Sequence, residues 1–203
     1  MSQGDAQTLV DHPILRRLQH ALATRPPVLA PDDGVPKRAA VAIVFRHTPE
    51  HDIELLLIKR SEREGDPWSG QIALPGGRHE PADATLQDTA IRETREETGI
   101  DLARDGIVLG MIDELRPRSQ GLPSIIVTPF VAVVRADVPI ETSDEVALAF
   151  WVPLASLSDP SVAVESEVTA RGATWRVPSW DLGGHIVWGM TERILRNLLL
   201  LLD

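Results

Sequence analysis

Residues 77–100 read GRHEPADATLQDTAIRETREETGI and divide into a glycine-led loop and a helical segment. Thr85 and Asp88 have the spacing of a capping box, and Gly99 stands where a helix would end. No Gly or Pro interrupts the residues between these two ends. The sequence therefore predicts a helix over residues 85–98.

Three glutamates share one face of this expected helix. Glu93, Glu96 and Glu97 are spaced i, i+3 and i+4, which places them within about 100° of one another. Like charges this close are destabilising unless they are paired, and hard oxygen ligands suit Mg²⁺ or Mn²⁺. The alternative is a solvated acidic face in which Arg92 pairs with Glu96. The glutamates alone leave both interpretations open.

Two adjacent glycines, Gly76 and Gly77, precede this segment. Glycine permits backbone conformations and a close ligand approach that a Cβ would obstruct, although by themselves two glycines indicate only a turn. Together with the helix, the loop resembles the Nudix box, G-x5-E-x7-R-E-U-x-E-E-x-G-U, in which U is bulky and apolar. At average residue frequencies, its five matching fixed residues coincide about once in a million windows. The residues that match in place are Arg92, Glu93, Glu96, Glu97, Gly99 and Ile100.

The chain departs from this motif in three places. Asp83 occupies the position of the first Glu, eight residues instead of seven separate it from Arg92, and Thr94 replaces an apolar residue. A loop can absorb the extra residue without moving the three glutamates relative to one another. We therefore expect the metal-binding end of the motif to be intact.

The resemblance to the Nudix hydrolases implies both a fold and a chemistry. The fold is the Nudix α/β/α sandwich, an α+β architecture with a mixed central sheet. The chemistry is metal-dependent hydrolysis of a diphosphate that links a nucleoside to another moiety. By this resemblance, Glu93 and Glu97 are the principal ligands of Mg²⁺ or Mn²⁺, and Glu96 assists them. Arg92 orients Glu96, and the Gly77 carbonyl adds a further ligand.

The general base comes, in this family, from a box glutamate or from a carboxylate on a later loop. Our candidate is Glu145, which stands just before an expected strand. An acidic side chain at such a position can swing toward bound metal ions. The alternative is an ordinary solvated loop residue.

Outside the box, the resemblance extends over residues 38–202 and narrows toward the coenzyme A pyrophosphatases. It implies hydrolysis of coenzyme A or acyl-coenzyme A to adenosine 3′,5′-bisphosphate and (acyl-)4′-phosphopantetheine. Three stretches carry it: Arg60-Ser61 with Gly70 and Pro75-Gly76-Gly77; Val127-Thr128-Pro129-Phe130 with Phe150-Trp151-Val152-Pro153-Leu154; and Ile186-Val187-Trp188-Gly189-Met190-Thr191 leading into Arg193-Ile194-Leu195.

Such a substrate needs basic groups for its phosphates. Our first candidates are Arg60 and Arg78, with Gly76 and Gly77 permitting close approach of the ligand. Further basic candidates are Lys59, Arg63, Arg116 and Arg118.

One loop departs from the coenzyme A pattern, because Asp66-Pro67-Trp68-Ser69-Gly70 stands where Arg-x-His-x-Gly is usual. Trp68 in this loop can stack on a base, pack against an apolar tail or simply anchor the loop. The alternative substrates are ADP-ribose, nucleotide sugars or another nucleoside diphosphate derivative. A function of a different class is a Nudix-fold module that binds a nucleotide without cleaving it, and the three intact glutamates argue against it.

Composition bounds these interpretations. The 203 residues carry 20 Lys and Arg against 30 Asp and Glu, a formal charge of −10, which argues against partners such as nucleic acid or an anionic membrane. The absence of Cys excludes disulfides and thiolate chemistry. The first residues do not resemble a signal peptide, and no apolar run reaches the ~20 residues of a membrane span. We expect a cytoplasmic protein and, from the Nudix resemblance, a homodimer.

The remaining pattern predicts one domain preceded by an extension. Residues 1–37 comprise an expected helix, at 11–24, and a Pro-rich linker, and residues 38–203 form the Nudix domain. A second long helix is expected over residues 187–202. Strands are expected at residues 39–45, 53–58, 107–115, 125–134, 146–152, 162–168 and 173–177, the last two as a hairpin around Arg171 and Gly172.

Overall fold

The computed structural model describes residues 8–32, 34, 37–66, 68–117, 124–170 and 173–202. Its elements, in chain order, are α2 (Pro13–Thr24), β1 (Lys37–Thr48), β2 (Asp52–Arg60), β3 (Ile72–Ala73), β4 (Gly76–Arg78), α3 (Leu86–Thr98), α4 (Leu102–Asp105), β5 (Gly106–Met111), β6 (Ile125–Val134), β7 (Val146–Pro153), the 3-10 helices η1 (Leu154–Ser158) and η2 (Pro160–Val162), β8 (Ala163–Ala170), β9 (Ala173–Leu182), β10 (His185–Trp188) and α5 (Gly189–Leu199).

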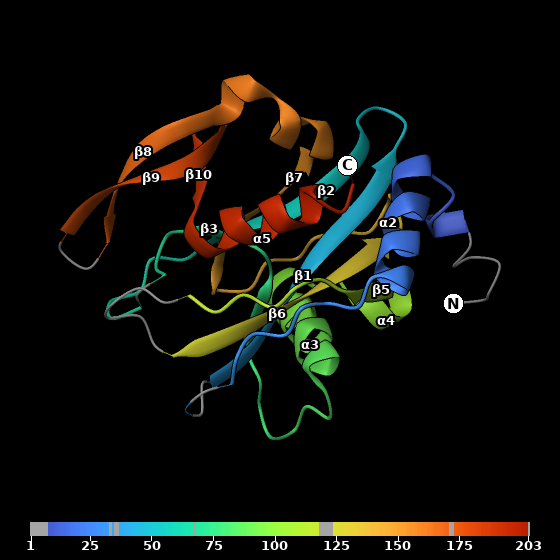
Figure 1. Ribbon diagram of the computed structural model, residues 1–203, viewed down its shortest axis with the longest axis horizontal. Coiled ribbons are helices and arrows are strands. Elements are labelled where there is room, and N and C mark those ends of the chain that lie inside the picture. The colour runs from blue at the N-terminus through green and yellow to red at the C-terminus, as the bar shows by residue number, and fades with distance from the viewer. Residues whose placement is uncertain are drawn as a thin grey trace.

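A mixed sheet forms the centre of the molecule (Figure 1). Within the described residues it has seven strands in the order β3-β2-β1-β6-β5, with β4 paired to β1 and β7 paired to β2 beside that path. β1 and β6 run parallel, and the other pairs recorded in this sheet are antiparallel. The β1–β4 pairing sets Ala40 opposite Gly77 and Val41 opposite Gly76. The diglycine is thereby attached to the middle of the sheet.

The central strands are buried on both faces. Along β1, Ile43 and Phe45 enter one hydrophobic core, whereas the intervening Ala42 and Val44 enter a second core on the other face. All ten residues of β6 are buried. Burial on both faces explains why these strands are continuous apolar runs in the sequence and do not alternate with polar residues.

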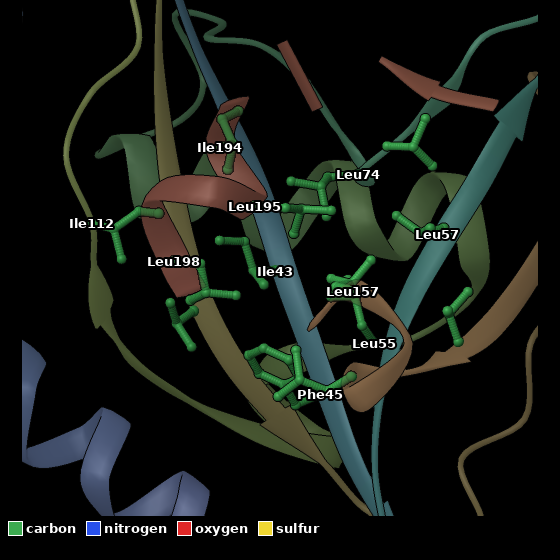
Figure 2. Close-up of a cluster of buried hydrophobic side chains, with 14 of the residues drawn as sticks. Ile43, Phe45, Leu55, Leu57, Leu74, Ile112, Leu157, Ile194, Leu195 and Leu198 are labelled. Atoms are coloured by element: carbon green, nitrogen blue, oxygen red, sulfur yellow. The ribbon is translucent and has the colours of Figure 1, made fainter. Parts of the chain in front are cut away.

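Helices cover both faces of the sheet. Leu18 of α2 and Leu195 of α5 belong to the first core, whereas Ala90 of α3 and Leu102 of α4 belong to the second. In Figure 1, α5 and α3 accordingly lie on opposite sides of the strands. Figure 2 shows the α5 side chains Ile194, Leu195 and Leu198 above β1 in the first core. This arrangement confirms the predicted α/β/α sandwich with a mixed sheet.

A smaller three-stranded sheet, β10-β9-β8, extends from the main body next to α5 (Figure 1). The expected hairpin is formed by β8 and β9, and its proposed turn residues, Arg171 and Gly172, lie outside the described residues. None of the helices in the described part of the chain is long and apolar enough to cross a membrane.

Several sequence-based boundaries were wrong. The strand expected over residues 173–177 continues to Leu182. The helix expected over residues 187–202 begins at Gly189, because Val187 is paired with Trp180 in β10. Gly189, with φ of +68°, then turns the chain from the strand into the helix, a conformation that glycine adopts readily.

The strand expected over residues 107–115 ends at Met111, and Leu115 forms only an isolated bridge to Val127. The shortest elements, β3, β4 and α4, were not predicted because two to four residues show no periodicity.

The α5 contribution to the first core can be measured directly. Leu195 is fully buried, so Leu195→Ala is expected to lower the free energy of unfolding by about 2–5 kcal/mol in a denaturant titration. Leu200→Ala removes the same atoms from an exposed position just after α5. We expect it to change the free energy of unfolding by less than about 0.5 kcal/mol. Equal effects would mean that α5 does not pack as described.

Candidate active site

The three glutamates predicted from the sequence all lie on α3, in different environments. The helix begins after Thr85, whose side chain accepts a hydrogen bond from the Asp88 backbone N–H, and it ends at Gly99, as expected. The Glu97 side chain is 3% exposed and the Glu93 side chain 15%, whereas that of Glu96 is 54% exposed. The helix therefore presents two carboxylates inward and one outward.

The diglycine strand β4 packs directly against the two inward carboxylates. The Gly76 N–H donates to Glu97 Oε2 at 2.8 Å. A Cβ added at Gly77 would collide with the Glu93 carboxylate, and one at Gly76 would collide with the Ala40 carbonyl oxygen. Gly76 also has φ of +153°, a conformation that side chains rarely adopt. Both positions thus require glycine for the carboxylates to lie against the strand.

Arg92 links the loop before α3 to one inward and one outward carboxylate of the helix. Its guanidinium donates to both oxygens of Asp83 at 2.9 and 3.0 Å. It also donates to Glu93 Oε1 at 2.9 Å, Glu96 Oε2 at 3.0 Å and the Arg78 carbonyl oxygen at 3.1 Å. Asp83 therefore pairs with Arg92 despite its shorter side chain and the inserted residue. Sequence reasoning noted Asp83 as a departure from the motif and missed this contact.

Burial shifts the acid–base properties of these groups. It raises the pKa of Glu97 to about 7, partly opposed by the Gly76 N–H and the nearby Arg60. It also raises the pKa of Glu93, here opposed by Arg92. Hydrogen bonds from Arg92 hold the pKa of Asp83 well below its usual range. The inward glutamates are thus carboxylates whose charge is only partly compensated by the protein.

A cavity of about 370 Å³ opens beside these carboxylates. Glu145 lines it together with Glu93 and Glu97, so the candidate base lies in the same cavity as the candidate ligands. The other predicted site residues that line the cavity are Arg60, Trp68, Gly76, Gly77 and Arg78. Glu96 and Arg92 belong to the hydrogen-bonded group next to it.

Two of the basic candidates are paired with acidic side chains. Arg60 lies 2.9 Å from Asp66 and 3.7 Å from Glu97, and its buried Nε has no hydrogen-bond partner among the described residues. Arg63 lies 2.8 Å from Glu145 Oε1. Sequence reasoning missed Asp66, because nothing in the local pattern shows that its loop folds back onto Arg60.

The remaining basic candidates differ in position. The structure shows Arg78 on the cavity lining, with no ion pair to its guanidinium in the part of the chain that is described. Arg116 donates to the Pro31 carbonyl oxygen, and Arg118 lies outside the described residues.

The acidic end of the cavity fits a divalent cation. Its donors are carboxylate oxygens, the hard ligands that Mg²⁺ and Mn²⁺ prefer. The missing Cβ at Gly77 leaves room for the Glu93 carboxylate against the backbone of β4. A cation there would also compensate the charge of two carboxylates that are largely withdrawn from water.

A separate group with metal-ligating side chains lies at the opposite end of β1. One potential ligand atom from each of His12, His47 and Asp52 lies within 4.8 Å of the others. The His12 Nδ1 accepts a hydrogen bond from the Ile14 N–H, which leaves the ring proton on Nε2, 2.8 Å from Asp52 Oδ1. The His12–Asp52 contact joins the start of α2 to the β1–β2 turn.

Known proteins resemble this chain in both sequence and fold. The family model of the NUDIX domain matches residues 36–172. The uncharacterised Nudix hydrolase NudL of Yersinia pestis (strain Pestoides F) is 34% identical over 163 residues, which cover 80% of this chain and 78% of that protein. Its counterpart from Yersinia pseudotuberculosis serotype O:1b (strain IP 31758) matches with the same figures. A MutT/nudix family protein from Enterococcus faecalis, 16% identical, superposes with a TM-score of 0.53 over 97% of this chain and 73% of that one.

The α/β/α sandwich and the diglycine packed against an acidic helix define a protein of the Nudix fold. The family match covers well over half of the chain, and the chain belongs to the Nudix hydrolase family. It is accordingly a pyrophosphatase that hydrolyses a phosphoric anhydride bond in a nucleoside diphosphate derivative.

The buried Asp83–Arg92 pair should contribute to stability in a pH-dependent way. Because folding lowers the Asp83 pKa, its contribution is present above the unfolded-state pKa of about 3.9 and is lost as the pH falls below that value. Asp83→Asn is expected to lower the free energy of unfolding at neutral pH by about 1.5–3 kcal/mol.

The difference between the Asp83→Asn variant and the wild type should shrink as the pH falls from about 5 to about 2 in chemical denaturation. Asp137→Asn, at an exposed position, provides the matched control and should behave as wild type. A difference that persists at low pH would contradict this electrostatic account.

Proposed function

We propose that this Nudix hydrolase cleaves coenzyme A or an acyl-coenzyme A into adenosine 3′,5′-bisphosphate and (acyl-)4′-phosphopantetheine. The observation that carries the proposal is the convergence of the three coenzyme A-like stretches on one cavity. Arg60 and the diglycine come from the first stretch, Val127 from the second, and Met190 and Thr191 from the third. These residues are separated by up to about 130 positions in the sequence, so their meeting at the acidic site supports a shared role in binding the substrate.

In this proposal the acidic end of the cavity holds the catalytic ions. Glu93 and Glu97 bind Mg²⁺ or Mn²⁺, and the Gly77 carbonyl is an additional ligand. Glu96 assists from outside the cavity, where its Oε2 accepts a hydrogen bond of 3.0 Å from the Arg92 guanidinium. A divalent ion bound there supplies charge neutralisation for the diphosphate and a water of lowered pKa.

Glu145 is the proposed general base. It lines the cavity with Glu93 and Glu97, and its carboxylate is half-exposed and paired with Arg63. A half-exposed ion pair on a surface is weak, so Glu145 can leave Arg63 and accept a proton from the attacking water. Arg63 keeps the carboxylate near the cavity between turnovers.

The substrate phosphates lie, in this proposal, near Arg78 and Arg60. Arg78 is exposed on the lining and available for a phosphate, whereas Arg60 is already paired with Asp66. Trp68 lies in the same loop as Asp66 and accepts the Gln71 N–H through its carbonyl oxygen. This loop places an aromatic ring beside the arginines, which suits a nucleobase.

The experiment that tests the proposal compares substrates. Purified protein with Mg²⁺ or Mn²⁺ is mixed with coenzyme A, acetyl-coenzyme A, ADP-ribose and nucleotide sugars, and the products are separated by chromatography. We expect adenosine 3′,5′-bisphosphate from the coenzyme A substrates, with kcat/KM at least about tenfold above the others.

Selective cleavage of ADP-ribose or a nucleotide sugar would overturn the substrate assignment and leave the metal-dependent hydrolysis in place. Cleavage of no compound would favour a module that binds a nucleotide without hydrolysing it.

Replacing the proposed base separates its role from metal binding. Glu145→Gln is expected to lower kcat by about 10²–10⁴ while leaving the affinity for Mn²⁺, measured by titration calorimetry, within about threefold. Arg63→Gln breaks the same ion pair but keeps the carboxylate, and kcat should remain within about threefold of the wild type. If Glu145→Gln retains full activity, the base lies elsewhere in the site.

A further inference from the structure

The cavity continues from the acidic end into a second region with a different chemistry. We call this region the aliphatic pocket, and its residues come from β1, β3, β6, α5 and the segment before β4. Its apolar lining residues are Val41, Ile72, Leu74, Val127, Met190 and Ile194, and the hydroxyl of the neighbouring Thr191 donates to the Ile72 carbonyl oxygen. Four of these apolar residues also belong to the buried core, and only a small part of each side chain is exposed. They are Ile72, Leu74, Val127 and Ile194.

β4 lies between the acidic end of the cavity and the aliphatic pocket, and it leaves the two regions connected. Its pairing with β1 sets Gly76 opposite Val41, and the Gly76 N–H holds Glu97. Because Gly76 and Gly77 have no side chains, the strand places only backbone between the carboxylates and the aliphatic pocket. If the diphosphate of a ligand lies at Glu93 and Glu97, the chemical group bonded to one of its phosphates therefore lies in the aliphatic pocket.

The chemistry of the pocket selects which half of the substrate enters it. A nucleobase or a sugar next to the phosphate would bury hydrogen-bonding groups against these apolar side chains, and unpaired buried polar groups are costly, whereas a branched alkyl group has none to lose. The aromatic and charged groups of the cavity, including Trp68, Arg60 and Asp66, lie in and beside the loop after β2. The two ends are thus suited to different halves of an unsymmetrical diphosphate.

We propose that the aliphatic pocket binds the phosphopantetheine half of the substrate, with the branched dimethyl carbon next to the 4′-phosphate packed against Met190 and Ile194. The proposal rests on the proposed function and adds the direction in which the substrate lies. It also makes α5, which follows the segment matched by the family model, a determinant of substrate choice. A hydroxylated sugar beside the phosphate would be rejected by the same side chains.

The test uses the two hydrolysis products as separate ligands of the metal-loaded protein. Met190 is half-buried, and Met190→Gln keeps its length while adding an amide to the pocket. We expect the Kd for 4′-phosphopantetheine to rise at least about tenfold and the Kd for adenosine 3′,5′-bisphosphate to stay within about twofold. Arg193→Gln, at an exposed position on the same helix, should change neither. Weakened binding of adenosine 3′,5′-bisphosphate alone would reverse the orientation and overturn the proposal.

A second measurement needs no variant and remains decisive if Met190→Gln does not fold. The wild-type protein should bind 4′-phosphopantetheine about fifteenfold more tightly than an analogue lacking the two methyl groups, at about fourfold for each buried methyl. Equal affinities would show that the dimethyl carbon is not in the pocket. The failures are distinguishable, because cleavage of coenzyme A with equal affinities overturns only this inference, whereas no cleavage of coenzyme A overturns the proposed function.

Discussion

The site depends on one contact, the hydrogen bond from the Gly76 N–H to the buried carboxylate of Glu97. It joins α3, on one face of the sheet, to a strand that is itself paired with β1. Neither glycine of β4 can carry a side chain in this arrangement. A Cβ at Gly76 would collide with β1, and a Cβ at Gly77 would collide with the Glu93 carboxylate. The same absence of side chains leaves the carboxylates next to a cavity whose far end lies over the opposite core.

Charge is arranged around this contact in two layers. Arg92 is hydrogen-bonded to Asp83, Glu93 and Glu96, so the outer side of α3 is compensated by the protein itself. Among the described residues, the Glu97 carboxylate is compensated only by the Gly76 N–H and by Arg60 at 3.7 Å, and burial raises its pKa. The protein therefore concentrates its uncompensated negative charge at the cavity, where a cation and a diphosphate together would restore balance. The distant His12–Asp52 contact has no such surplus and serves the fold.

The sequence predicted the elements that local rules control. The helix cap at Thr85, the stop at Gly99 and the strand over residues 125–134 follow from residue type and spacing, and the structure has them. Contacts set by loop conformation and tertiary packing were not predictable in this way. Asp66 folds back onto Arg60, Val187 pairs with Trp180, and Arg63 reaches Glu145 across 82 positions. The aliphatic pocket was not predicted either, because the sequence does not show that Val41, Ile72 and Leu74 meet residues of β6 and α5 in one cavity.

We propose that the carboxylates packed against β4 hold the catalytic ion. The most direct test of this proposal is a crystal soaked in Mn²⁺, with the ion located by its anomalous scattering. We expect Mn²⁺ to lie within about 2.0–2.3 Å of oxygens from Glu93 and Glu97, at the end of the cavity beside Gly77. Mn²⁺ bound at His12, His47 and Asp52, with the carboxylates of α3 unoccupied at saturating concentration, would contradict it.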